Sequence, residues 1–313
     1  MLSRRHIRIK VLQALYEYFQ NEGTEMTRGN KRLMESIHGI YDLYLFELKA
    51  LSDLLRIAED EIDRRKNKRL PTADDLNPST LFVDNLFLNW LKSNVNFNKQ
   101  IELNHVSWGE NREALRNIYK QMEASEEYAE YIALPENSIE ADKKFIKWVY
   151  GTYIVNSDLV HQLYEDKNMH WADDLDAAQM MVAKTIKRFS AEMDEFTALP
   201  KLIKDSDDLS FAETLYKKCI ANSEAYEELI HEKAVNWEMD RIALIDIILM
   251  KQAIAELTNF KEIPIKVTFN EYIELSKEYS TPKSGNFING ILDKLKTDLV
   301  DKGDIRKIGR GLL

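Results

Sequence analysis

The sequence has few of the residues that cross-link a fold or break its helices. Its 313 residues include one cysteine, 10 glycines and 6 prolines. The single thiol, Cys219, excludes an internal disulfide bond and a zinc site built on cysteines, and it fits a reducing cytoplasm. Because glycine, proline and runs rich in valine and threonine are scarce while 44% of the residues are hydrophobic, we expect an all-α fold.

Long apolar runs and catalytic motifs are absent too. The most apolar stretch, IALIDIILM, is interrupted by Asp246 and falls short of the roughly 20 residues that span a bilayer. The basic N-terminus lacks the apolar segment of a secretory signal. We find no glycine-rich phosphate loop and no Ser/His/Asp set in a recognisable context. We therefore expect a soluble, cytoplasmic protein that is not an enzyme and has no cofactor.

A carboxylate-bridged di-iron bundle is the sharpest catalytic alternative. Glu102 with His105, and Glu228 with His231, match the Glu-x-x-His step that such bundles use on facing helices. The first pair stands beside an asparagine-rich turn at Asn94, and pairs of this spacing are common in an acid-rich chain. The sequence therefore favours no metal site.

The charge pattern gives two opposing signals. The net charge of −10 argues against nucleic acid as a partner. Residues 1–16, however, hold Arg4, Arg5, Arg8 and Lys10 and no acid, on a helix that starts after a Ser3 cap. These cations lie mainly off the apolar stripe, so they form either a solvated face or one local phosphate-binding face.

Two longer features occupy the middle of the chain. Residues 31–69 predict one helix of about 55 Å, and its final RRKNKR suits a helix C-terminus better than it suits a second nucleic-acid patch. Residues 145–174 align without a gap with 211–240, and they share an Asn-Ser pair and a tryptophan. This fixed period indicates a duplicated helical unit with a degenerate copy at 145–189.

The stretch KVTFNEYIELSKEYSTPKSGNFINGILDK predicts two helices joined by a polar turn. Thr268 and Glu271 match a capping box at the start of the first helix. Ser280-Thr281-Pro282 should end it, and Ser284 is a plausible cap for the second helix. Gly290 is interpreted as a site where another helix packs closely.

This stretch resembles the C-terminal signature of the NusB family. The match is carried by Asn270-Glu271, by Ile273-Glu274-Leu275 and above all by the run from Phe287 to Lys294. Gln13-Ala14-Leu15-Tyr16 resembles the family's first helix, and the helix containing Asp246, Lys251 and Glu256-Leu257 resembles a third segment. The resemblance covers approximately residues 2–20 and residues 209–299, and it implies NusB-like helical bundles.

The resemblance suggests a division of the chain. We expect a basic first helix at 1–20 and a helical extension at 21–208. A NusB-like C-terminal bundle should follow at 209–300, with a flexible basic tail at 301–313.

The function that the resemblance implies is non-catalytic. It is binding of the boxA element of ribosomal RNA transcripts together with the NusE ribosomal protein, so that RNA polymerase in its antitermination complex passes terminators. One alternative is a helical protein-interaction scaffold without RNA binding. Another is an RNA-binding domain related to those of rRNA methyltransferases, which is disfavoured because no nucleotide-binding α/β pattern follows residue 299.

Single-stranded RNA needs cations for phosphate, an aromatic face for a base and amide groups for base edges. The family often has another arginine where this chain has His6, which should weaken the basic patch slightly. It commonly has an acid where this chain has Lys283, and a cation there should strengthen phosphate contact. Phe287 offers the aromatic face, although core packing is an equal alternative. Asp246 should lie toward NusE. The candidate RNA-binding residues, expected to form one composite site, are Arg4, Arg5, His6, Arg8, Lys10, Gln13, Tyr16, Lys251, Lys283, Ser284, Asn286, Phe287 and Asn289.

Overall fold

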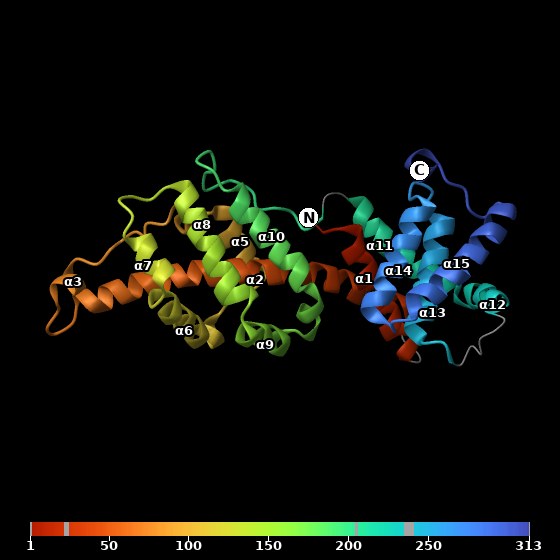
Figure 1. The fold of residues 1–313 in the computed structure, drawn as a ribbon, viewed down its shortest axis with the longest axis horizontal. Coiled ribbons are helices and arrows are strands. Elements are labelled where there is room, and N and C mark those ends of the chain that lie inside the picture. The colour runs from red at the N-terminus through yellow and green to blue at the C-terminus, as the bar shows by residue number, and fades with distance from the viewer. Residues whose placement is uncertain (1, 22–24, 204–205, 235–240, 313) are drawn as a thin grey trace. The chain divides into compact units, whose positions relative to one another are not determined.

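The structure is a computed structural model that describes residues 2–21, 25–203, 206–234 and 241–312. These ranges contain helices and no strand, so the expected all-α class is confirmed (Figure 1). None of the helices in them is both long enough and apolar enough to cross a membrane.

The chain forms two compact units, which we call the terminal unit (2–37 with 203–313) and the central unit (38–202). The terminal unit contains the beginning of the long helix α2 (Met26–Lys66). Its other helices are α1 (Arg4–Gln20), α11 (Ser206–Ala221), α12 (Ser223–Lys233), α13 (Leu244–Asn259), α14 (Ile265–Tyr279) and α15 (Ser284–Asp301).

The central unit contains the rest of α2, which the pattern from 31 to 69 correctly predicts as one long helix. A π-helical turn at Gly151–Val155 follows α8. The remaining helices are α3 (Ala73–Leu76), α4 (Leu86–Ser93), α5 (Val95–Leu103), α6 (Arg112–Glu123), α7 (Glu126–Ile132), α8 (Ile139–Tyr150), α9 (Asp158–Lys167) and α10 (Leu175–Arg188).

Helix α13 is the core of the terminal unit. It contacts α1, α11, α12, α14 and α15 (Figure 1), and every residue from Ile248 to Leu257 is buried. A helix that is apolar all round must be enclosed by other helices. Its four buried polar residues, Asp246, Lys251, Gln252 and Glu256, therefore stand out against an aliphatic sequence.

The segment after α15 returns to the end of α13. The Lys307 ammonium donates a hydrogen bond to the Phe260 carbonyl (2.9 Å), and the Ile308 amide donates to the Lys261 carbonyl (3.0 Å). A Cβ on Gly311 would lie 2.0 Å from the Lys261 carbonyl oxygen, so only glycine fits at this approach. These contacts anchor the residues that precede the C-terminus.

Three local predictions in the stretch from 266 to 294 are wrong. Helix α14 begins at Ile265, and Thr268 is buried inside it, where its hydroxyl donates to Glu256 (2.8 Å) instead of capping. Helix α15 has Lys283 at its N-cap position, and the Ser284 hydroxyl donates to Asp246. No described residue outside the backbone of α15 itself lies within 4 Å of a Cβ built on Gly290. The predicted end at Tyr279 is confirmed.

The two segments of the proposed duplication have the same order of helices. In each, a helix is interrupted at an Asn-Ser pair, Asn156-Ser157 or Asn222-Ser223, and a second helix follows. Trp171 is buried, whereas Trp237 lies outside the described residues. The duplication stays a prediction.

Glu47 is one of the carboxyl residues that the central unit buries completely. Glu47 of α2 accepts a hydrogen bond from the Tyr150 hydroxyl (2.7 Å). Burial raises the pKa of Glu47 to about 8, because the low-dielectric surroundings disfavour the anion more than the tyrosine stabilises it. The carboxyl group is therefore neutral over most of the physiological pH range.

We predict that the stability of the central unit falls as the pH rises. The folded-state pKa of Glu47 is raised from 4.5, so its contribution is fully present below pH 4.5 and is lost as the pH passes about 8. The loss should reach up to about 5 kcal/mol. Urea unfolding followed by tryptophan fluorescence should show this slope, and Glu47→Gln should flatten it. The exposed Glu165→Gln is the control, and a slope retained by Glu47→Gln would contradict the assignment.

Candidate nucleic-acid interface

Helix α1 begins after Ser3, as predicted, and the Ser3 hydroxyl accepts a hydrogen bond from the His6 amide. Its buried side chains include Arg8, which shares an i, i+3, i+4, i+7 stripe with Val11, Leu12 and Leu15. Lys10 is buried as well. The expectation that the cations of this helix face solvent is therefore wrong for Arg8 and Lys10.

Arg8 is held by a carboxylate that three helices share. Its Nε and Nη2 atoms each donate a 2.8 Å hydrogen bond to Glu256 of α13. The same carboxylate accepts from Thr268 (2.8 Å) and Tyr272 (3.1 Å) of α14. Burial alone would lower the pKa of Arg8, but the hydrogen bonds and charge of Glu256 raise it above its usual value. This ion pair joins α1 to α13, and the hydrogen bonds to Glu256 join both to α14.

The two arginines at the start of α1 are half-exposed and also bind carboxylates. Arg4 Nε lies 3.3 Å from Asp208, and Arg5 Nε lies 3.0 Å from Glu271. The hydrogen bond to Glu271 raises the pKa of Arg5. The basic start of the chain is thus largely balanced by acids of α11 and α14.

The other candidates on or near α1 differ in how far they are exposed. Lys251 is buried, donates to Ser223 (2.8 Å) and Glu227 (2.6 Å), and lies 4.8 Å from the centre of the Phe19 ring. Tyr16 is exposed, whereas Gln13 is half-buried. His6 is half-buried, with its Nδ1 atom 2.6 Å from the Ser3 hydroxyl. Lys251 therefore stabilises the bundle, and Tyr16 is the residue of this group that faces solvent.

The turn between α14 and α15 is built around Ser284. Its hydroxyl donates to Asp246 Oδ2 (2.7 Å) and accepts from the Thr281 amide (3.3 Å). Gly285 is buried beside it, and a Cβ there would lie 3.4 Å from Ser276 Oγ. The close helix approach thus occurs at Gly285 rather than at Gly290. These contacts fix the N-terminus of α15 against the N-terminus of α13.

A groove of about 630 Å³ opens beside this turn. Asp246 is 5% exposed, and its second carboxylate oxygen, Oδ1, is buried without a hydrogen-bond partner in the described part of the chain. Lys283 and Lys294 are exposed and form no ion pair with any side chain that the structure describes. The lining includes Lys233, Arg241, Asp246, Lys283, Asn286, Phe287 and Lys294.

The structure separates the candidates into two groups. Lys283, Ser284, Asn286 and Phe287 line the groove together, and Asn289 is exposed on the same helix. The carboxylates that hold two of the arginines lie away from this turn. Glu256, the partner of Arg8, is about 15 Å along α13 from Asp246 at the turn. Glu271, the partner of Arg5, is about 13 Å along α14 from Ser280 at the turn. The arginines of α1 therefore do not fold against the turn.

Sequence inspection missed three cations that line the groove, namely Lys233, Arg241 and Lys294. A signal for Lys294 was present, because Asn286, Gly290 and Lys294 recur every four residues and share one face of α15. Gly290 is exposed, so it leaves the space between the other two open.

The residues of the di-iron alternative are not arranged as a metal site. Asn94 caps helix α5, so Glu102 lies within a helix and His105 beyond its end with a φ of 50°. Glu228 and His231 lie on α12 beside other glutamates. Within the described ranges, no group of three or more His, Cys, Asp or Glu side chains is placed to hold a metal ion.

Comparisons with known proteins agree on one family. The NusB family model matches residues 169–297. The transcription antitermination protein NusB of Salinibacter ruber is 45% identical over 112 residues, which are 36% of this chain and 70% of the relative. The protein of the same name from Chloroherpeton thalassium is 36% identical over 65% of its own length and 44% of this chain. That from Citrifermentans bemidjiense is 35% identical over 81% of its own length and 38% of this chain. No solved structure matches the chain significantly.

We predict that Arg8→Met destabilises the terminal unit by about 3–5 kcal/mol, because it leaves Glu256 buried without a counter-charge. Urea unfolding by circular dichroism should show the loss, and hydrogen exchange should locate it in α1 and α14. Arg4→Met, at an exposed pair, should cost about 1 kcal/mol or less. Equal losses for the two variants would show that the buried pair does not hold the bundle.

Proposed function

The chain belongs to the NusB family, and we propose that it acts in transcription antitermination by binding boxA-type single-stranded RNA together with the NusE ribosomal protein. We place this activity in the cytoplasm, within the antitermination complex of RNA polymerase. The observation that carries the RNA proposal is the groove beside the turn before α15, where Lys283 and Lys294, exposed and without an ion pair to any described side chain, line the same surface as the Phe287 ring.

The groove offers the three chemical groups that single-stranded RNA needs. Lys283 and Lys294 can each bind a phosphate without first breaking an ion pair with a described side chain. Phe287 is half-buried, so it can both pack against the helices and present part of its ring to a base. The exposed amides of Asn286 and Asn289 can bond base edges.

The residues of α1 have two different roles in this proposal. Arg8, Lys10 and Lys251 are buried and position the helices. Arg4 and Arg5 are each 45% exposed, and exposed ion pairs are weak enough that a phosphate can replace the carboxylate. A strand that leaves the groove can therefore reach them, with Tyr16, Gln13 and His6 as further contacts.

The partner proposal rests on Asp246. Its Oδ2 atom is bound by Ser284, while Oδ1 has no donor among the described residues and borders the groove. A buried carboxylate oxygen gains stability when a donor reaches it. We propose that NusE supplies this donor, so that protein and RNA occupy adjoining parts of one surface.

We predict that Lys283→Asp weakens binding of a boxA-type RNA and reduces the magnitude of its salt dependence. Loss of one phosphate contact should lower the slope of log K against log salt by about 1. Fluorescence anisotropy at several salt concentrations measures both quantities. Lys302→Asp, the same charge change about 27 Å away along α15, is the control. If the two variants bind RNA with the same affinity and the same salt slope, Lys283 does not touch RNA.

We predict that Asp246→Asn weakens NusE binding about tenfold, because the charge that strengthens the accepted hydrogen bond is lost. Calorimetric titration of NusE into the full chain measures the affinity. The exposed Asp293→Asn on α15 should leave it unchanged. If neither RNA nor NusE binds the wild-type protein, the scaffold alternative takes the place of this proposal.

A further inference from the structure

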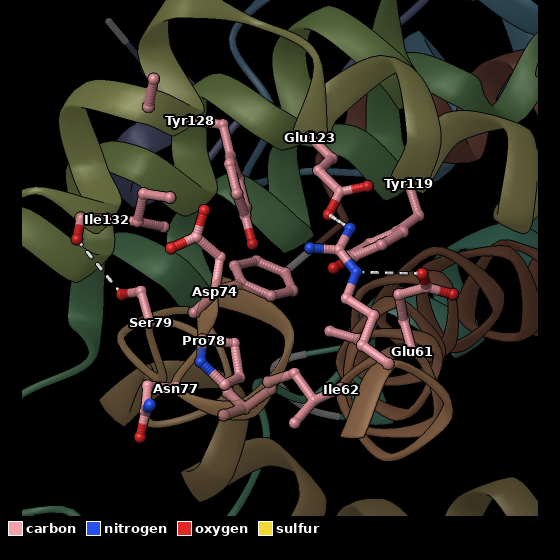
Figure 2. A pocket seen from close by; sticks show the side chains of 15 residues that line it. Glu61, Ile62, Asp74, Asn77, Pro78, Ser79, Tyr119, Glu123, Tyr128 and Ile132 are labelled. Atoms are coloured by element: carbon pink, nitrogen blue, oxygen red, sulfur yellow. Dashed lines mark hydrogen bonds and ion pairs between the residues drawn. The ribbon is translucent and has the colours of Figure 1, made fainter. Parts of the chain in front are cut away.

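The central unit contains a pocket of about 520 Å³ that has no part in the proposed RNA site (Figure 2). One wall is the face of α2 that carries Ala58, Glu61, Ile62 and Arg65. Helices α6 and α7, the short helix α3 and the loop from residue 77 to 83 form the rest. Every lining residue precedes residue 169, where the match to the NusB family model begins.

The floor of the pocket is aromatic. The ring of Phe82 lies 6.2 Å from that of Tyr119 and 5.9 Å from that of Tyr128, centre to centre. All three side chains are buried, and burial raises the pKa of both phenols, so the hydroxyls remain neutral. Such rings attract a cation placed over their faces.

Arg65, the cation among the described lining residues, is already paired with carboxylates. Arg65 binds Glu61 (3.2 Å) on its own helix and Glu123 on α6. In Figure 2 these carboxylates lie on one side of the pocket, whereas Asp74 lies on the other side with Ile132 and Tyr128. An incoming anion would therefore compete with two carboxylates for Arg65.

Asp74 is an exposed acidic residue in the pocket lining. Its neighbour Asp75 is held by Lys68 (2.8 Å) and by a capping box with Thr72, which fixes the short helix α3. Asp74 is exposed and forms no ion pair with any described residue. Glu126 and Glu130 of α7, also exposed and unpaired among the described residues, stand three residues before and one residue after the lining residue Ala129.

We propose that this pocket receives an arginine or lysine side chain of a partner protein. The aliphatic stem would pack on Phe82 and Ile132, and the charged end would lie between the aromatic rings and Asp74. The unpaired acids favour a cation, and the pocket is larger than a single ion requires. This role is separate from RNA binding and concerns the part of the chain outside the family match.

The surroundings favour a peptide over a free polyamine. Leu76, beside the lining residue Asn77, is 50% exposed, and Leu134, two residues after Ile132, is 37% exposed. Exposed leucines near a pocket provide apolar surface that the neighbours of the inserted side chain can cover. A polyamine has no groups that would use this surface.

The test uses the full chain and acetyl-Leu-Arg-Leu-amide as the probe, with binding measured by titration calorimetry. We expect saturable binding that weakens about tenfold when citrulline, which has the shape of arginine without its charge, replaces the arginine. Asp74→Asn should weaken binding of the arginine peptide by a similar factor, whereas the substitution Asp166→Asn, at an exposed site outside the pocket lining, should leave this binding unchanged. Spermidine should neither bind with comparable affinity nor displace the peptide.

A second variant protects the test against indirect effects of Asp74→Asn. Ala129 of α7 lines the pocket and is exposed, so Ala129→Arg places a tethered guanidinium at the proposed position. This variant should abolish peptide binding while circular dichroism stays unchanged. Any of three results would overturn the proposal. The citrulline peptide could bind as tightly as the arginine peptide, Ala129→Arg could retain peptide binding, or the wild-type chain could show no saturable binding.

Discussion

The buried ion pair of Arg8 and Glu256 is the constraint on which the terminal unit depends. Neither charge reaches water, so each requires the other, and the carboxylate also accepts hydrogen bonds from Thr268 and Tyr272. This arrangement fixes a residue near the start of the chain against two helices near its end. The intervening residues 38–202 can then form a unit with its own core, because the terminal unit is closed by contacts within 2–37 and 203–313.

The same constraint determines which cations remain for a ligand. In a chain with net charge −10, acids outnumber bases, and the three arginines of α1 are engaged by Asp208, Glu271 and Glu256. Lys251 is engaged in the same way by Glu227. Lys283, at the N-cap of α15, and Lys294, further along the same helix, differ because neither forms an ion pair with a described side chain. Local pairing, rather than the number of basic residues in a segment, therefore decides where phosphate can bind.

The sequence predicted features that depend on neighbouring residues and failed where distant residues compete. The start of α1 after Ser3, the length of α2 and the end of α14 before Pro282 follow from local chemistry. Thr268 matched a capping box, but Glu256 offers its hydroxyl a buried partner, so the helix begins earlier. Arg8 could have been recognised as buried, because it shares a stripe with Val11, Leu12 and Leu15. Its partner, 248 positions away, could not be found without the fold.

The family match and the compact units divide the chain at different places, and this difference limits what the central unit can be. The match begins at residue 169, yet residues 169–202 belong to the central unit, where α10 packs against α8. The central unit is therefore not an independent addition, since its core includes a segment shared with the family. Its pocket, in contrast, is lined only by residues from 58 to 132. A surface of this kind can acquire a partner of its own without altering the groove beside α15, because no lining residue is common to the two sites.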